Sequence, residues 1–215
     1  MDLRDKIDVA RPFGPTVGEI NVVNEFINNL NAYTESIILD KIKLTNQDAG
    51  KQLAGQVYQE FHIDKKFFDL KLNDYLSEII YAYLWKSIGK INFSKFKEFK
   101  DKITIRYNSS WMVRQFENEY NPIHSHGGNI SGVCYTMLPE KFGEKSQEIK
   151  KKNPNGHIAL VHGSEQFSSP ALKVIEPEIG KFILFPNYLL HTVYPFKGPG
   201  ERRSFSFNAD IVIKN

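Results

Sequence analysis

The feature that most constrains the fold of this chain is a change in hydrophobic period close to Lys102. Before it, apolar residues recur every three to four positions, whereas after it they lie in short extended runs separated by turn residues. The second half predicts roughly eight short strands without a helical interruption, which favours a sandwich or barrel, most simply a double-stranded jelly roll. The predicted strands are Ile103–Tyr107, Ser110–Phe116, Ile130–Met137, His157–His162, Leu172–Ile175, Lys181–Phe185, Thr192–Tyr194 and Ser204–Ile213.

The first half predicts helices. Residues 1–18 are expected to be irregular around Pro12, Gly14 and Pro15, with a short strand at Thr16–Ile20. A helix is expected from Asn21, since Val23, Phe26, Ile27 and Leu30 share one face. A stronger helix is expected from Asn73, as its cap, to Gly89, with an apolar stripe suited to packing on a sheet.

Helices followed by strands indicate an α+β chain that is mainly β. We expect one domain over residues 1–215, in which a helical part at about residues 1–100 buttresses a jelly-roll core at about residues 101–215. The polar stretch Lys141–Gly156 is expected to be an exposed loop.

Composition narrows the partners and the compartment. A formal charge of +3 and the short run Lys150–Lys152 do not favour nucleic-acid binding. Cys134 is the only cysteine, so no intrachain disulfide can form. Met1–Phe13 is charged throughout and no membrane span is apparent, so we expect a cytoplasmic protein. The sequence leaves the oligomeric state open.

A histidine pair opens the stretch NPIHSHGGNISGVCYTMLP, residues 121–139. In an extended backbone His124 and His126 point to one face, and His191 follows another strand pattern. Three convergent imidazoles suit a first-row transition metal better than magnesium or calcium. The remaining histidines, His62, His157 and His162, are interpreted as structural.

Arg202 and Ser204 also share one face of a predicted strand. A guanidinium fork with a hydroxyl beside it is a good receptor for a carboxylate. Arg203 should point the other way, toward solvent or a surface carboxylate. Cys134 should likewise point away from the site, whereas Trp85 and Trp111 are expected in the core.

The ordered segments H-x-H, SGVCYTMLP, FPNYLLHTVYPF and ERRSFSFN resemble the Fe(II)- and 2-oxoglutarate-dependent oxygenases. The resemblance spans about residues 105–210 and is strongest to small oxygenases of phages and bacteria whose core is similar to prolyl 4-hydroxylases. It implies a double-stranded β-helix and a location in the cytoplasm of a bacterium or of a phage-infected host. Fe(II), 2-oxoglutarate and dioxygen are the implied cofactor and co-substrates.

The resemblance also implies residue roles. His124 and His191 match metal ligands, Arg202 and Ser204 match the residues that bind the distal carboxylate of 2-oxoglutarate, and Tyr135 is placed to assist. His126 replaces the usual carboxylate ligand, and we expect it to be the third ligand. Glu117 or Glu119 is the competing candidate for that position. The implied reaction is hydroxylation of an unactivated carbon in a peptide or a small molecule, with release of succinate and carbon dioxide.

Two other classes fit parts of the pattern. Cupin-type metal enzymes use H-x-H and a later histidine, but they normally add a glutamate, and Gly127–Cys134 contains no acid. The second alternative is a non-catalytic jelly-roll protein of a virion, which would show neither tight metal binding nor a response to 2-oxoglutarate.

Overall fold

Two antiparallel sheets form the core of the chain in the computed structural model, which describes residues 3–4, 6–10, 14–89, 94–145, 149, 151–167 and 169–214. The larger, here the major sheet, has the strand order β1-β2-β9-β6-β11-β4-β3. Its strands are β1 (Asp8–Ala10), β2 (Val17–Asn21), β9 (Lys181–Pro186), β6 (Ile130–Met137), β11 (Arg202–Ile213), β4 (Ile103–Gln115) and β3 (Gln59–His62).

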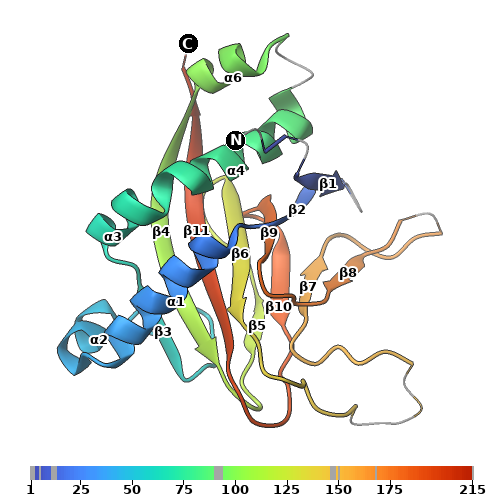
Figure 1. Cartoon of the computed structure of the whole chain (residues 1–215). Helices are drawn as coiled ribbons and strands as arrows, with labels where there is room; N and C mark the ends of the chain where they lie inside the picture. The colour runs from blue at the N-terminus through green and yellow to red at the C-terminus, as the bar shows by residue number, and fades with distance from the viewer. Residues whose placement is uncertain are drawn as a thin grey trace.

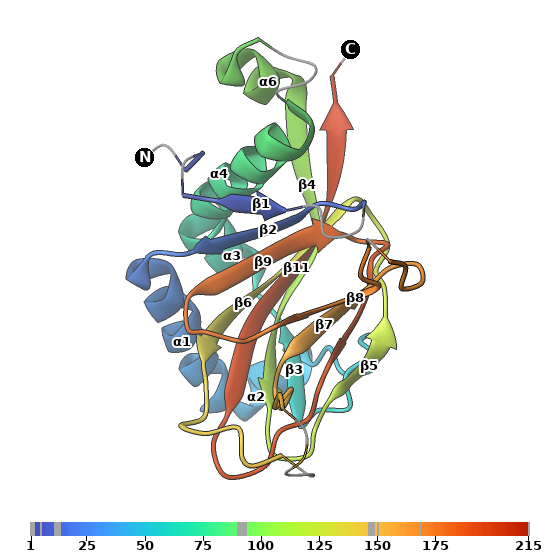
Figure 2. The ribbon, with the colours of Figure 1, turned by 90° about the vertical axis from the view of Figure 1, so that its right-hand side faces the viewer.

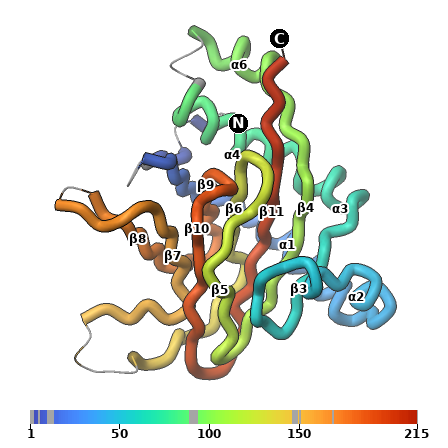
Figure 3. The backbone as a smooth tube through the Cα atoms, turned by 180° about the vertical axis from the view of Figure 1, so that it is seen from behind, coloured from blue at the N-terminus to red at the C-terminus, as the bar shows by residue number. Residues whose placement is uncertain are grey.

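The smaller sheet, here the minor sheet, has the order β5-β10-β7-β8. Figure 3 shows β5 and β10 in front of the major sheet. The two sheets therefore form the layered β core that the sequence predicts for a jelly roll. The minor strands are β5 (Asn121–His124), β10 (Leu190–Val193), β7 (Ile158–Val161) and β8 (Leu172–Ile175).

The described helices all precede β4 in the sequence, and two of them cover the outer face of the major sheet. Figure 1 shows α1 (Asn24–Ile38) and α4 (Asn73–Leu84) crossing that face, and the turned view in Figure 2 places the minor sheet on the opposite side. This is the predicted arrangement of buttressing helices. The remaining elements are α2 (Lys41–Gln47), α3 (Lys65–Lys71), the π-helical turn η1 (Trp85–Gly89) and α6 (Phe96–Lys102).

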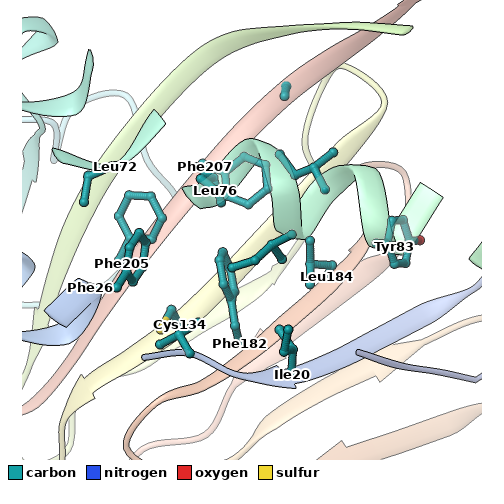
Figure 4. Close-up of a cluster of buried hydrophobic side chains, with 14 of the residues drawn as sticks. Ile20, Phe26, Leu72, Leu76, Tyr83, Cys134, Phe182, Leu184, Phe205 and Phe207 are labelled. Carbon is teal, nitrogen blue, oxygen red and sulfur yellow. The ribbon is translucent and has the colours of Figure 1, made fainter. Parts of the chain in front are cut away.

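An aromatic core joins the helices to the major sheet (Figure 4). The Phe26 ring from α1 lies 5.8 Å from that of Phe205 on β11, in an edge-on arrangement. Cys134 is fully buried in the same cluster, so it points away from the space between the sheets, as predicted. Gly132 leaves room for the rings: a Cβ there would lie 2.5 Å from Phe207 and 2.7 Å from Phe182.

A second core fills the space between the sheets. Val133 and Ile183 from the major sheet pack with Leu160 from β7 and Leu189 beside β10. Strand alternation explains the division, because neighbouring residues of β6, such as Cys134 and Tyr135, enter different cores. The candidate site adjoins this second core.

Several local predictions were wrong. The two strands expected at residues 103–116 are one strand, β4, which bulges at Asn108 where Ser109 and Tyr107 oppose consecutive residues of β11. Asn73 is the first helical residue of α4 and not its cap, because α3 ends at Lys71 and Leu72 alone separates the two helices. The N-terminal segment expected to be irregular contains β1.

Other expectations need smaller adjustments. The first helix begins at Asn24 instead of Asn21. The segment between this helix and Glu60, for which we made no prediction, contains α2 and the start of β3. The described residues of Lys141–Gly156 form no helix or strand, which agrees with the expected loop. Two residues named in the sequence analysis, Pro12 and Lys150, lie outside the described part of the chain. Among the described residues, no helix is both long and apolar enough to cross a bilayer.

Candidate active site

His124, His126 and His191 converge at the site. Their candidate ligand nitrogens all lie within 4.8 Å of one another, and among the described residues they form the one group of this kind. His124 and His191 are directly opposite each other on β5 and β10. His126 lies beyond the end of β5 at His124, so the loop, and not strand alternation, brings its ring to the other two.

Burial keeps two of these imidazoles neutral. It lowers the pKa of His191 to about 3, and the neighbouring His124 adds to the effect. Burial and His124 likewise lower the pKa of His126 to about 4. Both rings therefore carry a free lone pair at neutral pH, which is the form that binds a metal ion.

Hydrogen bonds fix the orientation of two of the rings. Nδ1 of His124 lies 2.7 Å from the carbonyl oxygen of Pro122, and Nδ1 of His191 lies 2.9 Å from that of Leu189. With a proton on Nδ1, each ring donates to its carbonyl and leaves Nε2 free for a metal. Three imidazoles that converge on one point suit Fe(II) or a neighbouring first-row ion.

Arg202 lies in the same pocket and is only 2% exposed. Its Nη1 donates to Oε1 of Gln115 at 3.0 Å, but its Nε and Nη2 have no hydrogen-bond partner in the part of the chain that the structure describes. These two nitrogens share one edge of the guanidinium, so a complete fork of donors is free. A buried arginine edge of this kind fits a carboxylate, which accepts two parallel hydrogen bonds.

Two further polar groups accompany that edge. Ser204 lines the pocket and is 3% exposed. The Tyr135 ring lies beneath the Arg202 guanidinium, 4.7 Å from centroid to Cζ, and its buried hydroxyl has no hydrogen-bond partner among the described residues. Unpaired polar groups at full burial are costly unless a ligand satisfies them. The structure thus brings together the three residues that were predicted to bind a carboxylate, and it leaves one edge of Arg202 and the hydroxyl of Tyr135 unpaired.

Arg203 points to the helical side of the major sheet, as predicted. It is 2% exposed, which excludes a position in solvent, and it pairs with Glu201 at 2.6 Å and with Glu35 of α1 at 2.8 Å. Glu35 is a surface carboxylate, with 55% of its side chain exposed. Arg203 therefore fastens α1 to the sheet.

The competing acids accept hydrogen bonds from the backbone instead of joining the histidines. Glu117 accepts the backbone N–H of Gly198, and Glu119 accepts that of Phe116, each at 2.8 Å. The remaining histidines form separate contacts, with His62 bonding to Gln52 and His157 to the Asn155 carbonyl.

Sequence reasoning missed some residues of the site. Trp111 is buried, as predicted, but it also lines the pocket, and its ring lies 5.7 Å from that of His126. Gln115, the partner of Arg202, and Asn121 were not singled out. Trp111, Val113 and Gln115 are spaced two positions apart on β4, so the strand period could have placed all three on the inner face.

A family model described as "Putative 2OG-Fe(II) oxygenase" matches residues 109–208 of this chain. The matched segment contains all six candidate site residues, from His124 to Ser204. Among curated proteins, no sequence match was found.

Solved structures of prolyl hydroxylases share the fold. A viral collagen prolyl hydroxylase from Paramecium Bursaria Chlorella virus-1, in complex with 2OG, is 15% identical with a TM-score of 0.52, covering 91% of this chain and 94% of that one. A Pseudomonas putida prolyl-4-hydroxylase is 14% identical with a TM-score of 0.51, covering 100% and 96%. A Trichoplax adhaerens prolyl hydroxylase, in complex with a hypoxia inducible factor peptide fragment, is 12% identical with a TM-score of 0.55, covering 95% and 83%.

Proposed function

Because this chain belongs, through residues 109–208, to the 2OG-Fe(II) oxygenase family, we propose that its three convergent histidines and its unpaired arginine edge form the active site of a hydroxylase. The enzyme uses Fe(II) and 2-oxoglutarate. His124, His126 and His191 hold the metal in our proposal, and Arg202, Ser204 and Tyr135 hold the co-substrate. The observation that carries these assignments is that the three histidines, Arg202 and Ser204 line one pocket, while the Tyr135 ring packs against Arg202.

When bound, the iron and 2-oxoglutarate supply the oxidising chemistry, in which dioxygen and 2-oxoglutarate give succinate, carbon dioxide and one hydroxyl group on the substrate. The chain supplies binding, orientation and exclusion of water. His124 and His191 present Nε2 because their Nδ1 protons are held by carbonyls. Burial lowers the pKa of His126 and of His191, so neither of these two imidazoles has to lose a proton first at neutral pH.

Arg202 orients the co-substrate. Its free Nε and Nη2 edge binds the distal carboxylate of 2-oxoglutarate, while Gln115 prevents the guanidinium from rotating. The Ser204 and Tyr135 hydroxyls complete the set of donors. Val133 and Phe185 form the apolar walls of the pocket and limit the entry of water.

We place the substrate that becomes hydroxylated, as distinct from the co-substrate, in a depression of about 480 Å³ that is lined by His62, Phe68, Tyr107 and Ser110, among others. His62 connects it to the site, since His62 is opposite Trp111 in the pairing of β3 with β4, and directly paired residues share one face of a sheet. A peptide or a small molecule with an unactivated C–H bond is the substrate class, and the peptide complex of the Trichoplax relative supports the first. Once a substrate is found by succinate release, Ser110→Trp should raise its KM and leave the affinity for 2-oxoglutarate unchanged.

An anaerobic titration tests the function itself. Fe(II) is added to the protein, then 2-oxoglutarate, and the weak visible charge-transfer band of the chelate is followed. We expect the band to appear only with both. A cupin-type enzyme would bind iron without the band, and a non-catalytic jelly-roll protein would bind neither tightly.

A further inference from the structure

The ring of His126 has no side-chain hydrogen bond among the described residues, in contrast to the rings of His124 and His191. Metal-binding histidines almost always have such a bond, because it fixes the tautomer and the direction of the free nitrogen. Something other than a ring contact to a carbonyl must therefore direct His126. The nearest candidate is the loop that carries it.

Asn187 holds that loop. It lies between β9 and β10, is 1% exposed, and its carbonyl accepts the backbone N–H of His126 at 2.9 Å. Its own N–H donates to the carbonyl of Asn129 at 3.3 Å, and its side-chain Nδ2 donates to that of Gly127. One residue thus contacts three of the four residues in the loop 126–129.

The Asn187 side chain also ties this loop to the major sheet. Its Nδ2 lies 3.4 Å from Oδ1 of Asn208 on β11, which accepts a hydrogen bond of 2.6 Å from Ser131 on β6. Asn187 also leaves no room for a side chain at Gly128, where φ is +106° and a Cβ would lie 3.1 Å from Nδ2 of Asn187. The loop is consequently held between a turn and the sheet, and its two glycines do not leave it free.

We propose that Asn187 is the positioning residue for His126: its side-chain amide does for this ligand what the backbone carbonyls do for the other two. The inference rests on the proposed function, in which His126 is a metal ligand. The backbone bonds of Asn187 survive any substitution, so the side-chain amide can be tested separately. Removing it frees the Gly127 carbonyl and loosens the loop on which His126 is carried.

The probe is Co(II) alone, titrated into the purified protein by calorimetry without 2-oxoglutarate. Asn187→Ala should lower the Co(II) affinity about 10- to 100-fold, the usual loss when a partner of a ligand is removed. Asn187→Asp, of the same size but without the donor, should lower it too. Asn187→Ser retains a hydrogen-bond donor, so its Co(II) affinity should lie between that of the wild type and that of Asn187→Ala. If the alanine variant does not fold, the serine variant provides the test.

A matched control is Asn155→Ala. Asn155 also holds a loop through its side-chain amide, which bonds to the carbonyls of Phe142 and Glu144. That loop carries no candidate ligand, so the Co(II) affinity should be unchanged. An equal loss in both variants would show that general loosening, and not the position of His126, explains the result.

A double-mutant cycle decides whether Asn187 acts through His126. In a His126→Ala background, Asn187→Ala should have no further effect on Co(II) affinity. A full additional loss there, or no loss in the single Asn187 variants, overturns the inference. If His126→Ala itself binds Co(II) like the wild type, the ligand set of the proposed function is wrong instead.

Discussion

The guanidinium of Arg202 lies 4.7 Å from the centroid of the Tyr135 ring, and both side chains are buried with polar atoms that find no hydrogen-bond partner among the residues that the structure describes. The contact brings β11 and β6 together at one end of the pocket, where Ser204 is opposite Tyr135. A charged group buried in this way without a carboxylate is costly, so the arrangement favours binding of an anion.

Arg202→Ala should therefore weaken 2-oxoglutarate binding. Removing one partner of a buried charge pair commonly costs ~3–5 kcal/mol, which corresponds to a loss of about 150- to 4,000-fold in affinity. The measurement is calorimetric titration of 2-oxoglutarate into the anaerobic Fe(II) protein. Arg106→Ala, at an exposed arginine near Asp210, is the control. Unchanged affinity in the Arg202 variant would remove this residue from the co-substrate site.

Arg203→Ala should have the opposite profile. We expect the affinity of the folded protein for 2-oxoglutarate to stay near that of the wild type, because Arg203 faces the helices. The free energy of unfolding should fall by ~2–4 kcal/mol, since Glu201 and Glu35 lose a buried partner. Urea denaturation measures the change. If the two arginine variants exchanged these profiles, the assigned strand faces would be incorrect.

The metal ligands are tested by comparing His126→Ala with Glu117→Ala and Glu119→Ala. Only the histidine variant should lose Fe(II) affinity, because each glutamate already accepts a hydrogen bond from a backbone N–H group. His126→Asp should retain the metal, since an aspartate at this position restores two histidines and one acid. Loss of iron in a glutamate variant, with normal binding by His126→Ala, would contradict the three-histidine site.

Glu60 on β3 should make stability depend on pH. It is 4% exposed, and burial, then the charge of Asp48, raises its pKa from 4.5 to about 7. The folded state therefore keeps this proton at pH values where the unfolded state has released it. The contribution of Glu60 to stability thus falls as pH rises from 4.5 to about 7 and is constant above that.

Glu60→Gln removes this penalty. Its free energy of unfolding should exceed that of the wild type by ~2–4 kcal/mol at pH 8, and the difference should shrink toward pH 4. Denaturant unfolding at both pH values measures it, with Glu140→Gln on the surface as the control. A constant difference across this range would mean that Glu60 does not titrate as described.

Several features of the fold and the site follow from local periods in the sequence and could be predicted from it. Strand alternation placed Arg202 and Ser204 on one face and Arg203 on the other, and it separated Cys134 from Tyr135. The change of period near Lys102 predicted the order of helices and strands. These features follow from residues that are close in the chain, so one sequence contains enough to infer them.

The partners of those residues, in contrast, are known only from the three-dimensional fold. Gln115 meets Arg202, Asn187 holds the His126 loop, and Glu35 reaches Arg203 across a separation of 168 positions. His126 converges with His124 through a loop, although the sequence suggested a strand. Such contacts depend on how distant strands pair and on which side chains then fill the space between the sheets, and no local period encodes either.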